Sequence, residues 1–177
     1  MFDLDTGKFV IRDGVELYPG MTRETFFKSS LYQTELLRDS DRQDLGKYNY
    51  SIKPQTIDGF EMSVDIYVSD YGYVDKIELT RPDFYDWPHW PSNIKEADYA
   101  YDIKRYNDRF LEHQLQESVR EANELSYSYE WGSLTSSINL RHTPHVMITI
   151  RYKETPFLKA RGITFDHIDI FENGPAN

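Results

Sequence analysis

The chain lacks cysteine altogether, and this absence excludes disulfide bonds and thiolate metal sites. It also lacks a long apolar run, since none approaches the roughly 20 residues that a membrane-spanning helix requires. Residues 1–5 are acidic and do not show the charged and then apolar pattern of a signal peptide. We therefore expect a cytoplasmic protein with no membrane segment.

Basic residues are in deficit. Lys and Arg number 20 against 30 Asp and Glu, which leaves a formal net charge of −10. Such a surface repels phosphate backbones, so we expect no nucleic-acid partner. It suits a basic protein partner, although acidity also serves solubility. The chain is rich in aromatic residues, including 14 tyrosines, and amphipathic rings are useful in cores and at interfaces alike.

Signatures of catalysis are scarce as well. The chain has no Gly-x-Ser-x-Gly turn and no Gly-rich phosphate loop. His142 and His145 have a spacing that a metal could use, but no third ligand lies near them. We predict no metal and no cofactor, and we favour a non-enzymatic protein. An enzyme that uses Glu61 and Asp65 is a third hypothesis, after the two binding functions given below.

The most regular stretch is residues 59–69, where apolar and polar residues alternate strictly. Successive side chains of a strand point to opposite faces, so this pattern predicts a strand with one dry and one wet face. A half-solvated strand belongs to an antiparallel sheet. The dry face carries Phe60, Met62, Val64, Ile66 and Val68, and the wet face carries Glu61, Ser63, Asp65, Tyr67 and Ser69.

The first half of the chain reads as a hairpin, a helix and three strands. Asp13 and Gly14 form the hairpin turn, and Thr22 caps a helix over residues 23–32 that could extend to residue 37. Residues 38–46 are polar and irregular. Residues 48–57 form a strand with a bulge near Pro54, because proline cannot donate to a ladder. Pairing Ile66 with Ile77, and Val64 with Leu79, requires an even-numbered loop.

The second half reads as a helix and further strands. Three prolines make residues 82–91 a loop, and a long helix follows over residues 94–122. Residues 125–131 alternate and end at a predicted turn, residues 132–133. That turn pairs three sets of residues: Trp131 with Leu134, Tyr127 with Ile138, and Leu125 with Leu140. A strand follows over residues 146–152, and a late strand could cover residues 163–171.

These elements predict a single α+β domain over residues 1–177. We expect a mostly antiparallel sheet built from two three-stranded meanders, with two helices on one face and an N-terminal hairpin. The approximate halves are residues 1–80 and 94–153. An aromatic connector, residues 82–93, joins them, and residues 154–177 form a C-terminal extension.

Two groups of residues are candidates for partner binding, because large rings supply contact area and carboxylates attract a basic partner. The connector could instead tuck a tryptophan over the sheet edge, and the wet strand face could simply be solvated. The connector supplies Asp83, Tyr85, Asp86, Trp87 and Trp90, and the wet strand face supplies Glu61, Asp65 and Tyr67.

Four segments, residues 7–11, 19–22, 129–132 and 148–152, resemble a group of uncharacterised bacterial α+β proteins. In those proteins a strand pair leads into a Pro-x-Met-Thr helix start, and a Trp-Gly hairpin precedes the last strand. The resemblance covers most of residues 7–152, consists of turn and cap features, and implies no activity. By its small size and acidity the chain is also similar to bacterial immunity and antitoxin proteins.

Our leading functional hypothesis is a non-enzymatic protein-interaction domain, an immunity-type inhibitor of a basic partner such as a bacterial toxin. The alternative is a small-molecule binding domain with a pocket between sheet and helix. Neither the partner nor the oligomeric state follows from the sequence.

Overall fold

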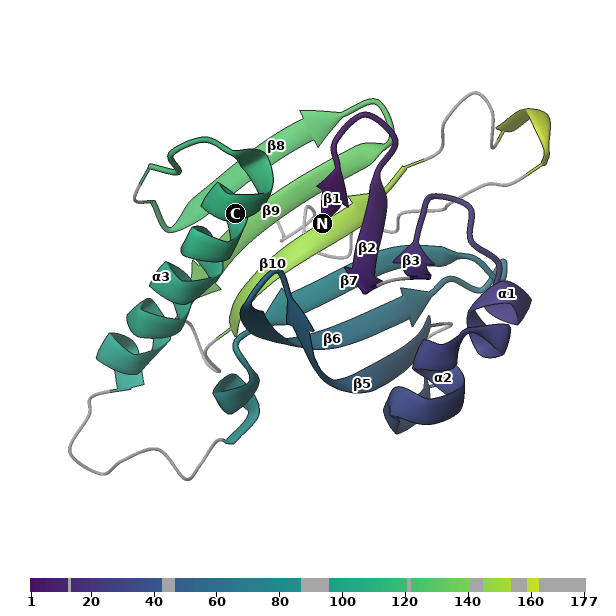
Figure 1. Ribbon diagram of the computed structural model, residues 1–177, viewed down its shortest axis with the longest axis horizontal. Helices are drawn as coiled ribbons and strands as arrows, with labels where there is room; N and C mark the ends of the chain where they lie inside the picture. The colour runs from purple at the N-terminus through teal and green to yellow at the C-terminus, as the bar shows by residue number, and fades with distance from the viewer. Residues whose placement is uncertain are drawn as a thin grey trace, which may run out of the picture.

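A computed structural model describes residues 1–12, 14–42, 47–86, 96–120, 122–140, 145–153 and 159–162. Its helices and strands confirm the α+β class (Figure 1). In chain order they are β1 (Phe2–Asp3), β2 (Lys8–Arg12), β3 (Val15–Leu17), α1 (Arg23–Lys28), α2 (Ser30–Glu35), β4 (Leu36–Arg42), β5 (Lys47–Ile57), β6 (Phe60–Val68), β7 (Val74–Thr80), the 3-10 helix η2 (Pro82–Asp86), α3 (Glu96–Leu115), β8 (Glu124–Tyr129), β9 (Gly132–Asn139) and β10 (His145–Tyr152).

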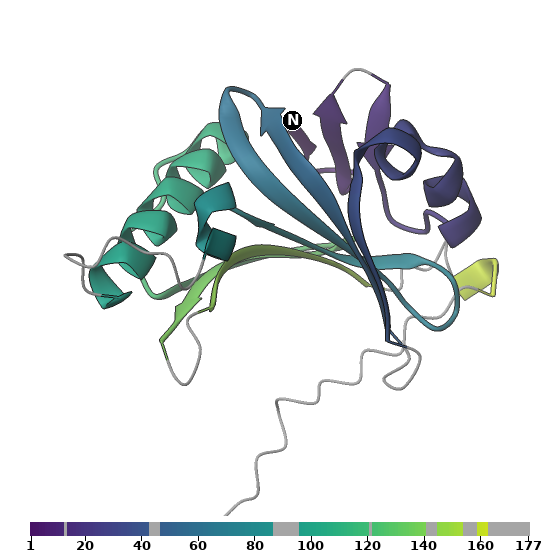
Figure 2. The ribbon, with the colours of Figure 1, turned by 90° about the horizontal axis from the view of Figure 1, so that it is seen from below.

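The strands form two antiparallel sheets. The large sheet has seven strands in the order β4-β5-β6-β7-β10-β9-β8, and the small sheet has the order β1-β2-β3. Pairing of β10 with β7, which sets Ile148 opposite Leu79, joins the two predicted meanders into one sheet. Figure 2 shows the large sheet as a curved layer with the helices and the small sheet on one side. The β5–β6 hairpin rises between α3 and the small sheet.

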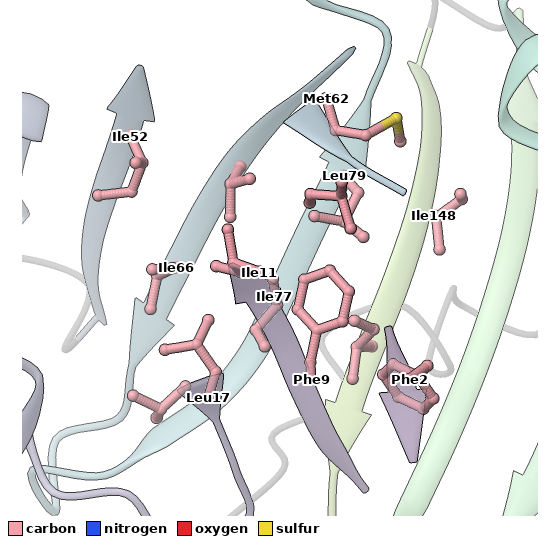
Figure 3. Packing of buried hydrophobic residues seen from close by; sticks show 14 of the residues in the cluster. Phe2, Phe9, Ile11, Leu17, Ile52, Met62, Ile66, Ile77, Leu79 and Ile148 are labelled. Atoms are coloured by element: carbon pink, nitrogen blue, oxygen red, sulfur yellow. The ribbon is translucent and has the colours of Figure 1, made fainter. Parts of the chain in front are cut away.

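The core lies between the two sheets. Phe9 and Leu17 of the small sheet are fully buried and face Ile66 and Ile77 of the large sheet (Figure 3). The dry face predicted for β6 is therefore confirmed, because Met62, Val64, Ile66 and Val68 are all buried. Burial of such apolar surface supplies the main stabilisation that holds the small sheet in place.

Trp131 anchors the N-terminal strands. Its Nε1 donates a hydrogen bond of 2.7 Å to the carbonyl oxygen of Leu4, 127 residues away in the chain. Its ring lies 5.4 Å from that of Phe2 and stacks at 5.0 Å on that of Tyr129. The backbone of Gly7 passes directly against the indole. Residues 7–11 and 129–132, two of the four segments on which the resemblance rests, therefore lie against each other in the fold.

The predicted helix over residues 23–32 is two short helices. The side chain of Thr22 accepts a hydrogen bond from the Thr25 amide and begins α1, as expected. Ser29 then has an extended backbone, and its side chain accepts from the Tyr32 amide to begin α2. The expected irregular stretch over residues 38–46 is wrong in part. Residues 36–42 form β4, because the rim of β5 offers them a partner.

The predicted registers of β5, β6 and β7 hold with one correction. Ile66 pairs with Ile77 and Val64 with Leu79, and a bulge between Ile52 and Gln55 turns Ile52 into the core. The even-numbered loop is wrong, since Val68 pairs with Val74 across residues 69–73. A bulge at residue 75 accommodates the odd residue.

The predicted turn of the β8–β9 hairpin is wrong. The strands turn at residues 130–131, so that Tyr127 pairs with Leu134 and Leu125 with Ser136, rather than with Ile138 and Leu140. The observed register lets the Trp131 indole reach under the N-terminal strands. The faces of the strands are as predicted, because the register differs by an even number of residues.

Helix α3 ends at residue 115, earlier than the predicted 122, and Gln116 has a positive φ of 54°. Its buried face carries Ile103, Phe110 and Leu111. The predicted start of this helix at residue 94 and the late strand over residues 163–171 lie outside the described residues. Within the described ranges, no helix combines the length and apolarity needed to cross a membrane.

Candidate functional site

A half-open groove of about 970 Å³ is the candidate site. Its floor is the polar face of β5 and β6. One wall comes from β4 and the bulge of β5, and the other from η2, the residue before it, and α3. Figure 2 shows the β5–β6 hairpin beside η2 and α3, and residues of all these elements line the groove.

Two neighbouring bulges shape the first wall. Leu36 pairs with Ile52 and Arg38 with Ser51, which leaves Leu37 as an extra residue in β4. The β5 bulge at residues 53–54 lies close by and brings Pro54 to the groove. Bulges bend a strand and re-aim its side chains. As a result Leu37 is 66% exposed although it is apolar, and it lines the groove.

A row of polar side chains crosses the floor. Arg38 of β4 lies opposite Ser51 of β5, Ser51 opposite Asp65 of β6, and Asp65 opposite Glu78 of β7. Asp65 is only 7% exposed, so its carboxylate lies at the base of the groove. Further along β6, Glu61 is exposed at the rim. The floor therefore presents two carboxylates of different depth on one strand.

The second wall is held together by Arg81. Its Nε donates to Asp83 Oδ1 and its Nη1 to Asp102 Oδ2, both at 2.6 Å. The hydroxyl of Tyr99 donates to the other oxygen of Asp83 at 2.6 Å. Burial alone would lower the pKa of Arg81, but the hydrogen bonds to Asp83 and Asp102 raise it. Asp83 thus has a fixed orientation, and its charge is balanced within the protein.

Tyr106 of α3 connects this wall to the floor. Its hydroxyl accepts a hydrogen bond of 2.8 Å from the Glu61 amide and donates one of 3.1 Å to the Glu61 carbonyl. Its ring packs edge-on against Phe60 at 5.6 Å, with the guanidinium of Arg81 5.7 Å from the ring centroid. The aromatic wall of the groove is therefore positioned by contacts on several sides.

Tyr67 contacts residues of the neighbouring strand β7 and is not among the residues that line the groove. Its hydroxyl donates to Glu78 at 2.6 Å, and Lys76 donates to the other oxygen at 2.8 Å. Lys76 also lies 3.6 Å from the centroid of the Tyr67 ring. Burial alone would raise the pKa of Glu78, but Lys76 and Tyr67 hold it below its usual value. This cluster keeps the Glu78 charge compensated beside Asp65.

The structure describes the side chains of four of the eight candidate residues and brings three of these four together. Glu61, Asp65 and Asp83 line one groove, although Asp83 belongs to a different sequence segment. Tyr67 is not among the lining residues. Tyr85 and Asp86 belong to η2, and Trp87 and Trp90 lie outside the described residues.

Sequence reasoning missed Arg81, Tyr106 and the exposed Leu37. Arg81 directly precedes the proline-rich connector, and Tyr106 lies within the predicted long helix. Their roles depend on partners that lie far away along the chain, at Asp102 and Glu61. No local pattern signals such contacts.

No protein-family model, no curated protein and no solved structure matches this chain.

Among the side chains that the structure describes, no three His, Asp or Glu residues are grouped as a metal site would need.

Proposed function

We propose that this protein is a non-enzymatic binding protein whose groove accepts a positively charged segment of a protein partner. In this proposal it acts as an immunity-type inhibitor of a basic partner such as a bacterial toxin. The observation that carries the proposal is the convergence of Glu61, Asp65 and Asp83 on one groove. A partner that fills the groove would bring its own cations to Glu61 and Asp65, while Asp83 keeps its ion pair with Arg81.

Two further features support a basic partner. The formal net charge of −10 would steer a cationic protein toward the surface, an effect that salt screens. The wall formed by Arg81, Asp83 and Tyr106 is held by several hydrogen bonds, so little side-chain ordering remains to oppose binding.

The test compares a groove variant with a control of equal charge. Glu61→Gln with Asp65→Asn removes two charges from the groove, and Glu24→Gln with Asp5→Asn removes two charges from exposed positions that do not line it. Partners captured from the native host at low salt are identified by mass spectrometry, and the affinity of each is measured by calorimetry.

We expect the groove variant to bind a basic partner at least roughly tenfold more weakly than the control, because charged hydrogen bonds are lost. The proposal fails if no basic partner is captured, or if both variants bind the partner equally well. Circular dichroism of each variant checks that the fold is retained.

A second candidate function is the binding of a small molecule, which the size of the groove favours. A volume of about 970 Å³ lies within the usual range for ligand sites. Leu37, Pro54, Pro82 and the Tyr106 ring supply apolar contacts beside the carboxylates. A thermal-shift screen of cationic metabolites tests it. A ligand that stabilises the wild type and the control, but not the groove variant, supports this function.

A further inference from the structure

We infer that the segment entering the groove is extended, lies along β6, and carries two long basic side chains four residues apart. This inference rests on the proposed function and specifies the sequence that the groove recognises: basic-x-x-x-basic.

The spacing follows from the floor of the groove. Glu61, Ser63 and Asp65 alternate on one face of β6 and all line the groove. With a rise of about 3.3 Å per residue, the outer two positions are separated by roughly 13 Å. A segment extended along the same direction repeats its side chains at the same interval. Its first and fifth residues therefore face the two carboxylates, and its third faces Ser63.

The depth of the floor decides the kind of side chain. Asp65 is 7% exposed and Ser63 is 9% exposed, so both lie at the base. A lysine or arginine has a stem long and narrow enough to bring its charged end to Asp65. Midway, Ser63 carries no charge, so a third basic side chain would meet no carboxylate there.

The walls suit the stems of these side chains. Leu37, exposed by its bulge, and Pro54 line one side, while Pro82 and the Tyr106 ring line the other. Aliphatic stems of lysine and arginine pack against such apolar surface while the charged ends pair with carboxylates. Leu37 would then be covered rather than exposed.

The two arginines that line the groove, Arg38 and Arg81, limit which residues the segment can carry between its two basic positions. Arg81 is paired with Asp83 and Asp102, so its charge is already balanced. Arg38 lies two strands from Asp65 on the same polar row, at the β4 side of the groove. Its charge repels any additional basic residue that points toward β4. We therefore expect the intervening residues of the segment to be neutral or acidic.

The probes are capped, fluorescently labelled pentapeptides. Lys-Ala-Ser-Ala-Lys has the inferred pattern, and Lys-Lys-Ala-Ser-Ala is an isomer of equal charge. Their affinities for the full chain at low salt are measured by fluorescence anisotropy. We expect the first peptide to bind at least roughly tenfold tighter than its isomer, because only the first peptide meets both carboxylates.

Variants separate this inference from the proposed function. Glu61→Gln, at an exposed position, should reduce the preference for the spaced peptide over its isomer, and the Glu24→Gln and Asp5→Asn control should leave it unchanged. The inference is overturned if the two peptides bind equally, or if neither binds. If they bind equally but lose affinity in the Glu61→Gln variant, the pattern is wrong while the groove still binds basic segments.

Discussion

Replacing Gly7 with alanine tests the contact that fastens the small sheet to the large one. Gly7 has a φ of +73°, in the left-handed region that side chains rarely adopt. An added Cβ would lie 2.5 Å from Cδ2 and 2.6 Å from Cγ of Trp131. These separations are far shorter than carbon–carbon contact, so either the indole or the turn must shift.

The structure limits how far Trp131 can move. Its indole is 3% exposed, donates a hydrogen bond to Leu4, and is stacked on Tyr129. The left-handed backbone costs about 1–2 kcal/mol for a residue with a Cβ. Forcing an extra group into a packed core costs about 1–3 kcal/mol more. We expect the Gly7→Ala variant to lose about 2–5 kcal/mol of unfolding free energy. In a domain of this size, this corresponds to a fall of roughly 4–20 °C in Tm.

The matched control is Gly59→Ala. Gly59 has a φ of +85°, but nothing lies within 4 Å of an added Cβ. This variant should therefore lose only the backbone part, about 1–2 kcal/mol. Both variants are compared with the wild type by urea unfolding and by thermal unfolding, followed by circular dichroism. If Gly7→Ala proves no less stable than Gly59→Ala, the close packing of Gly7 on Trp131 does not contribute to the stability of the fold.

Three further predictions concern stability and pH. Tyr106→Phe removes the hydroxyl that bridges the Glu61 backbone and should lower the unfolding free energy by about 1 kcal/mol in urea titrations; no change would show that the bridge contributes nothing. Thr22→Ala removes the cap of α1 and should cost about 1 kcal/mol by the same assay, whereas Thr22→Ser should restore most of it. Lys76→Met removes a group that lowers the pKa of Glu78 in the folded protein. Since that lowered pKa stabilises the fold above the unfolded-state pKa, the stability gap between wild type and variant should be largest near neutral pH and shrink as the pH falls through the folded-state pKa; a gap independent of pH would contradict the assignment.

Local patterns in the sequence were sufficient for much of the sheet. Strict alternation over β6 identified its dry face, and matching the apolar residues of β7 to it yielded the pairs Ile66–Ile77 and Val64–Leu79. The bulge before Gln55 was predictable because proline has no amide to donate and because the apolar residues otherwise faced outward. These features depend on side-chain period and backbone chemistry within a few residues.

Features that need a distant partner were not predictable in this way. Residues 36–42 have a mostly polar sequence without alternation. They form a strand because the edge of β5 offers their backbone hydrogen-bond partners. The β8–β9 turn falls at Trp131 rather than at the glycine, because the indole packs beneath residues from the N-terminus. In both cases long-range contacts outweigh weak local preferences.

The candidate groove also combines features that the local sequence predicts with features that depend on distant contacts. Composition and alternation alone identified Glu61 and Asp65 as polar positions on one strand face and Asp83 as an acid in an aromatic connector. Only the tertiary structure decided that Asp83 would face them, because this needs the bend at two bulges, the Arg81 pairs and the Tyr106 bridge to β6. The alternation of side chains along a strand depends on neighbouring residues. The curvature that forms a groove depends instead on contacts between segments that are distant in the sequence.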